Sequence, residues 1–154
     1  MSIPDFDQWG NLPPGVYFCT WDEFIDRFQT NLHRARLIQG LIKAMIILKT
    51  AGCRTIYING SFVTQKPKPN DFDACWETDG VDFNYILNNA PELLDFYDKR
   101  MKQKIKYKGE LFPIDMLADG GDLNFFELFQ IDQIQNRKGI IAIDLMRWDY
   151  DHCQ

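Results

Sequence analysis

The chain has 154 residues, of which 45% are hydrophobic, including 12 Phe, 6 Tyr and 4 Trp. This length and composition fit one compact domain with its own core, and they exclude disorder as the dominant state. The net charge of -5 argues against a generally basic nucleic-acid-binding protein, and no apolar run reaches the roughly 18 residues that a membrane span requires.

The N-terminal segment and the cysteines indicate a cytoplasmic protein. The segment MSIPDFDQWG is acidic and contains Pro and Gly, which is not the pattern of a secretory signal. The cysteines, Cys19, Cys53, Cys75 and Cys153, are scattered, without the C-x-x-C spacing of a zinc site or the density of a disulfide framework. We therefore expect four reduced thiols in the cytoplasm.

The first part of the chain is predicted to be an irregular arm followed by two helices. Residues 1–15 are rich in Pro and Gly, which favours irregular structure. Thr20 and Glu23 have the spacing of a capping box, and apolar residues recur at helical spacing from Trp21 to Phe28. A longer amphipathic pattern predicts a second helix from about Leu32 to Thr50.

The rest of the chain is predicted to alternate strands with helices. The expected elements are a strand at Arg54–Asn59, a loop at Gln65–Asn70, a strand at Asp71–Trp76, a helix from Pro91 to about Met101, a strand at Leu111–Leu117, a short helix at Phe125–Phe129 and a strand at Gly139–Leu145. Within a single domain 1–154, residues 16–52 then form a helical N-terminal part and residues 53–145 a sheet core. This order predicts an α/β or α+β fold with helices packed on a mixed sheet.

A candidate phosphate site lies where the first predicted strand ends, at Gly60-Ser61. Glycine lets the backbone approach a ligand closely, and free amides in the following turn favour an anion such as a phosphate. The Ser61 hydroxyl adds a further hydrogen-bond donor. Lys66 and Lys68, in the loop that follows, are candidate phosphate contacts; the alternative is that these lysines beside prolines are simply exposed.

Three acids are candidate metal ligands. Asp71 and Asp73 are two residues apart on a predicted strand, so their side chains are expected on the same face. Two carboxylates this close repel each other unless a cation lies between them, and Mg²⁺ often combines carboxylates with substrate phosphates. Asp115, between Ile114 and Met116, is a candidate base or ligand of a second metal if its strand lies next to that of Asp71. The alternative is that Asp71 and Asp73 merely face solvent after a Pro-Asn turn.

The combination resembles the nucleotidyltransferase superfamily of the polymerase-β type, over roughly residues 54–117. The Gly60-Ser61-Phe62 motif is similar to that of small bacterial members, and the wider pattern looks like an uncharacterised bacterial family assigned to this fold. The resemblance implies that Gly60 and Ser61 hold a nucleoside triphosphate such as ATP. It also implies that the three acids carry Mg²⁺ or Mn²⁺, and that a nucleoside monophosphate passes to a hydroxyl of a protein, an RNA or a small molecule.

Two further interpretations stay open. Because small bacterial transferases of this type often work with a helical partner protein, the chain is alternatively one half of a toxin–antitoxin or defence pair, with or without turnover. A basic run before the third strand is either a solvated helix face or a local funnel for a triphosphate or an RNA acceptor. The run consists of Lys99, Arg100, Lys102, Lys104, Lys106 and Lys108.

Overall fold

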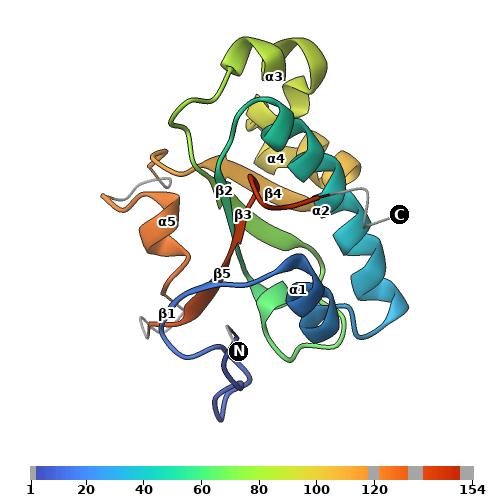
Figure 1. Ribbon diagram of the computed structural model, residues 1–154, viewed down its shortest axis with the longest axis vertical. Helices are drawn as coiled ribbons and strands as arrows, with labels where there is room; N and C mark the ends of the chain where they lie inside the picture. Colours follow the sequence, from blue (N-terminus) through green and yellow to red (C-terminus); the bar gives the residue numbers. More distant parts are fainter. Residues whose placement is uncertain (1–2, 118–121, 132–136, 150–154) are drawn as a thin grey trace.

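The computed structural model describes residues 3–117, 122–131 and 137–149 and contains one five-stranded mixed sheet (Figure 1). Its strands are β1 (Gly15–Phe18), β2 (Thr55–Asn59), β3 (Phe72–Trp76), β4 (Gly109–Pro113) and β5 (Gly139–Asp144). In the order β1-β5-β2-β3-β4, β2 is antiparallel to both of its neighbours, whereas the edge strands β1 and β4 are parallel to theirs. The predicted α+β class with a mixed sheet is confirmed.

Helices precede and connect these strands. They are α1 (Trp21–Phe28), α2 (Leu32–Thr50), α3 (Phe83–Asn89), α4 (Tyr97–Tyr107) and α5 (Phe125–Leu128), with short 3-10 helices η1 (Ser61–Val63) and η2 (Pro91–Leu94). Thr20 and Glu23 form the predicted capping box at the start of α1, each side chain accepting from the other residue's backbone N–H. Asn31 caps α2 by accepting from the Arg34 N–H. Both helices have the predicted bounds.

Several elements differ from the prediction. β1 lies within residues assigned to the irregular arm and the helical part, and α3 was not predicted. The helix expected from Pro91 to about Met101 is divided into η2 and α4, and α4 itself is kinked by a left-handed turn at Asp98–Arg100. The third strand ends at Pro113 instead of Leu117, which changes the site described below.

The two faces of the sheet are covered by different helices (Figure 1). Ile56, Ile58 and Ile143 belong to a large core that includes the apolar residues of α1 and α2. On the opposite face, Tyr57 and Phe112 contact the aromatic rings of α5, with Phe112 and Phe125 stacked at 3.7 Å between ring centroids. Towards the Asn59 end of β2, this second face changes from apolar to polar.

Two other findings concern the class of protein. No helix in the described part of the chain combines the length and the apolar character needed to cross a membrane. Cys19, Cys53 and Cys75 are free thiols, and burial raises the pKa of each, to about 12 for Cys19 and Cys53. Cys153 lies outside the described residues.

Candidate functional site

A row of polar residues crosses three neighbouring strands at one end of the sheet. Asn59 on β2 lies opposite Asp73 on β3, and Asp73 lies beside Glu110 on β4. Residues paired in this way are about 5 Å apart and project their side chains from the same face of the sheet. We call these three residues the polar row. Asp71 directly precedes β3 and adds a second aspartate next to it.

The backbone at Gly60 lies in close contact with the Asp73 carboxyl. Its φ of +82° is in the left-handed region, and a Cβ added at this position would lie 2.6 Å from Oδ2 of Asp73. Only glycine accommodates both conditions without a shift. Ser61 follows as the first residue of η1, where a helix start presents N–H groups that the helix itself does not use. The structure therefore places Gly60, Ser61, Asp71 and Asp73 together.

The pKa values of the three acids at the site, Asp71, Asp73 and Glu110, are shifted in different directions. Burial raises the pKa of Asp73 to about 8, and a hydrogen bond to Glu110 and the charge of Asp71 act in the same direction. Burial and Glu110 also raise the pKa of Asp71. Although burial opposes ionisation of Glu110, hydrogen bonds from Asp73 and Arg100 lower its pKa. In the absence of a cation, Asp73 therefore keeps its proton to higher pH than Glu110 does, and the two side chains share a hydrogen bond.

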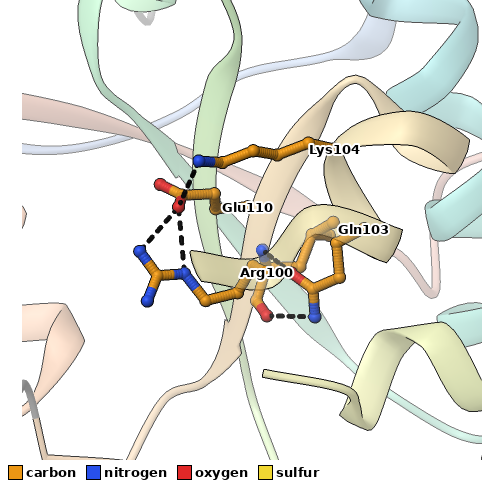
Figure 2. Close-up of polar contacts among 5 residues, drawn as sticks. Arg100, Gln103, Lys104 and Glu110 are labelled. Carbon is orange, nitrogen blue, oxygen red and sulfur yellow. Dashed lines mark hydrogen bonds and ion pairs between the residues drawn. The ribbon is translucent and has the colours of Figure 1, made fainter. Parts of the chain in front are cut away.

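Helix α4 places two cations on Glu110 (Figure 2). Nε and Nη2 of Arg100 donate to Oε1 of Glu110 at 3.0 and 2.8 Å, and Nζ of Lys104 lies 3.4 Å from the same oxygen. Gln103 is fully buried and fixes the helix to β4, because its amide donates to the Leu111 carbonyl and accepts from the Leu111 N–H. The position of α4 is thus coupled to the polar row.

The basic run does not form a free cationic surface. Four of its six cations are in ion pairs, Arg100 and Lys104 with Glu110, Lys102 with Asp95 and Lys106 with Glu92. Among the described residues, only Lys99 and Lys108 of the run lack an ion pair. The run offers less free positive charge than its sequence indicates, which weakens the interpretation that it binds RNA.

Two other lysines approach the acids from different segments. The charge of Lys66 opposes the rise that burial causes in the pKa of Asp71, and the charge of Lys138 opposes the corresponding rise for Asp73. Lys138 directly precedes β5, at the end of that strand that lies beside the end of β2. The sequence did not single out Lys138. Lys68 is exposed and makes no hydrogen bond or ion pair with any residue of the described ranges.

Asp115 does not join the other acids. β4 ends at Pro113, opposite Trp76, and Asp115 follows in an exposed turn at the other end of β3 from Asp73. From Glu110 to Pro113 alone the strand extends about 10 Å. The third predicted strand therefore does lie beside the Asp71-Phe72-Asp73 strand, as expected, but the acid that it places next to Asp73 is Glu110.

A buried arginine holds the loop between Ser61 and Asp71. Arg34, on α2, is 2% exposed, and its guanidinium lies 4.8 Å from the ring centroid of Phe62. No ion pair within the described ranges involves it. Instead, it donates to backbone carbonyl oxygens at 2.6 to 3.2 Å, namely those of Phe28, Phe62, Thr64 and Lys66. The Arg34 guanidinium therefore fixes the loop that carries Lys66 to helix α2.

The oxygen atoms at the site suit a hard divalent cation. Within the described residues, no three His, Cys, Asp or Glu side chains are grouped so that they hold a metal ion on their own. Mg²⁺ requires less, because it is usually bound by one or two carboxylates together with waters and substrate phosphates. Asp71 and Asp73 supply the carboxylates, and Oδ1 of Asn59 is a buried oxygen without a hydrogen-bond partner. These donors fit the Mg²⁺ or Mn²⁺ that the sequence implies.

Fold and site together define a class of protein: an α+β domain with a glycine turn and clustered acids at one end of a mixed sheet. The model described as "Family of unknown function (DUF6932)" matches residues 4–144, so the chain belongs to that family. No curated protein shows a significant match to the sequence, and neither does any solved structure. Since the family description assigns no activity, an inference of function depends on the site.

Proposed function

We propose that the protein is a Mg²⁺-dependent nucleotidyltransferase, which transfers a nucleoside monophosphate from a nucleoside triphosphate to a hydroxyl acceptor. The observation that supports this most is the close approach of Gly60 to Asp73, beside Asp71 and Glu110. Backbone N–H groups at a turn next to paired carboxylates are what metal-assisted phosphoryl transfer requires.

Each group has a role that follows from its position. Ser61 and the amides at the start of η1 bind phosphate oxygens, and Gly60 lets this turn lie close to the Asp73 carboxyl. Asp71 and Asp73 would hold the divalent cation, which when bound neutralises charge on the triphosphate. Lys66 and Lys138 lie beside these acids and bind the outer phosphates.

Glu110 takes the role that the sequence assigned to Asp115. It is the acid of the polar row that stays ionised, so it accepts the proton of the attacking hydroxyl. Its lowered pKa makes it a weak base, and most of the rate acceleration therefore comes from positioning and from neutralisation of phosphate charge.

The test uses the full-length protein with Mg²⁺ or Mn²⁺ and each of the four nucleoside triphosphates labelled at the α-phosphate. Pyrophosphate release and labelled products on protein, RNA and small-molecule hydroxyls are measured. Asp73→Asn and Glu110→Gln should each lower the rate about 100-fold or more, as loss of a group active in the transition state does. Asp115→Asn, which changes an exposed acid at the other end of β3 from Asp73, should stay within about twofold. Equal rates for Asp73→Asn and wild type would overturn the proposal.

The second candidate is a binding module that acts with a helical partner in a toxin–antitoxin or defence pair. It is favoured by apolar side chains left exposed on α4, beside the site: Tyr97 is 86%, Met101 49% and Ile105 67% exposed. Co-expression with the product of a neighbouring gene, followed by size-exclusion chromatography, tests it. Ile105→Glu should dissociate such a complex, and full turnover by the isolated monomer would count against this candidate.

A further inference from the structure

Asn59 is a buried polar residue without a structural partner. It is the last residue of β2, it is 3% exposed, and its Oδ1 accepts no hydrogen bond from any described residue. The preceding residues Ile56, Tyr57 and Ile58 are apolar over most of their surface and buried. An unpaired acceptor at the end of such a strand costs free energy comparable to a lost hydrogen bond. An apolar residue would avoid that cost.

The neighbours of Asn59 explain why its oxygen is unpaired. Asp73 lies opposite on β3, and its carboxyl is hydrogen-bonded to Glu110 on the far side. On the other side, the register that sets Ile58 opposite Ile141 brings Ile140 next to Asn59, and this buried side chain has no donor. No residue of the described ranges therefore donates to Oδ1, and the atom is available to a bound ligand.

We propose that Asn59 is a further metal-binding residue of this site, whose Oδ1 coordinates the divalent cation held by Asp73, directly or through one water. The proposal rests on the proposed function. Amide carbonyl oxygens are common ligands of hard cations, and they are neutral. In a cluster that already contains Asp71, Asp73 and Glu110, a neutral oxygen adds a ligand without adding a further repelling charge.

Replacement by leucine separates this role from a structural one. Asn59→Leu removes the unpaired oxygen and adds apolar contact with Ile140, so the melting temperature in EDTA should equal or exceed that of wild type. The rise in melting temperature caused by Mn²⁺ should be lost at the same time. A residue needed only for folding would give the opposite result, a lower melting temperature in EDTA. Asn88→Leu, at an exposed position of α3, is the matched control and should change neither value.

Binding of Mn²⁺ itself gives a second measurement. Free Mn²⁺ is followed by electron paramagnetic resonance during titration of the full-length protein, without nucleotide. We expect Asn59→Leu to weaken binding about tenfold or more, as loss of a group at a metal site does. Asn59→Asp keeps an oxygen in place and should bind at least as tightly as wild type, which covers the case in which the leucine variant does not fold.

The outcomes separate this inference from the proposed function. If wild type binds Mn²⁺ and Asn59→Leu binds it equally well, the role of Asn59 is refuted while the proposed function stands. If Asn59→Leu loses affinity for ATP but not for Mn²⁺, the residue contacts substrate and is not a metal-binding residue. If wild type and Asp73→Asn bind Mn²⁺ equally weakly both without nucleotide and with ATP present, the proposed function fails, and the role of Asn59 fails with it.

Discussion

Replacing Arg34 by methionine should remove a large part of the stability of the protein. The guanidinium donates to four carbonyl oxygens, of which those of Phe28 and Phe62 are buried. Methionine keeps the length of the side chain but leaves both buried carbonyls without a donor, at about 1–3 kcal/mol each. The carbonyls of Thr64 and Lys66 are only partly buried, so water replaces the guanidinium there at little cost. The expected loss is therefore roughly 2–6 kcal/mol.

This loss is large compared with the roughly 5–15 kcal/mol that separates a folded domain from its unfolded state. For a chain of this length it corresponds to a fall in melting temperature of about 5–20 °C. Urea unfolding followed by tryptophan fluorescence measures the free energy, and an unchanged m-value would show that the unfolded state is unaffected. Arg36 lies on the same helix but is exposed, so Arg36→Met should stay within about 0.5 kcal/mol of wild type.

The lysine variant tests the geometry of the interaction. Arg34→Lys keeps the charge and three donors but loses the planar fork that reaches carbonyls of several segments, so its loss should lie between those of wild type and Arg34→Met. Because the loop held by Arg34 carries Lys66, both variants should also bind nucleotide more weakly than their stability alone explains. If Arg34→Met were as stable as wild type, the guanidinium would not be what fixes this loop.

Three further expectations concern the polar row and its surroundings. Gly60→Ala should destabilise the protein more than Gly80→Ala in urea unfolding. Both glycines have a positive φ, so the backbone strain is similar. The added Cβ contacts Asp73 at position 60, whereas it meets nothing within 4 Å at position 80. In EDTA, the free energy of unfolding should fall as pH rises from about 4 to 8, and Asp73→Asn should flatten this profile. The reason is that the pKa of Asp73 is raised from 3.8 to about 8 on folding, so the folded state keeps a proton that the unfolded state has lost. Glu110→Gln should speed amide hydrogen exchange across α4, because it weakens the acceptor shared by two cations of that helix.

The elements that were predicted correctly are those with local causes. The capping box at Thr20 and the helical spacing of apolar residues fix α1 and α2 within the segments themselves. β1 has only four residues, and its partner β5 lies at the other end of the chain, so nothing near β1 in the sequence indicates a strand. The same contrast holds at the site. The Gly60-Ser61 turn and Asp71-Phe72-Asp73 form a local pattern, whereas the third acid depends on pairing between distant strands.

The expected position of Asp115 beside Asp73 was wrong because of strand register and side-chain alternation. β4 begins at Gly109, so Glu110 lies beside Asp73, and the strand has ended before Asp115. Even a longer strand would not have helped, since residues 110 and 115 differ by an odd number and project from opposite faces. The segment Leu111–Leu117 is apolar on both sides of Asp115, so its faces are not readable from sequence. The available signal was Glu110 itself, an acid two residues after Lys108, the last of the six basic residues.

Two features that oppose folding occur together at one end of the sheet. Asn59 buries an unpaired oxygen, and burial raises the pKa of the Asp73 carboxyl beside it. Elsewhere, the same strands carry apolar residues that follow the usual alternation. Selection for stability alone would have replaced Asn59 and Asp73 individually, since each has an apolar substitute. Their concentration around one glycine turn therefore argues for a ligand that makes the missing interactions, because natural sequences depart from local consistency mainly at functional sites.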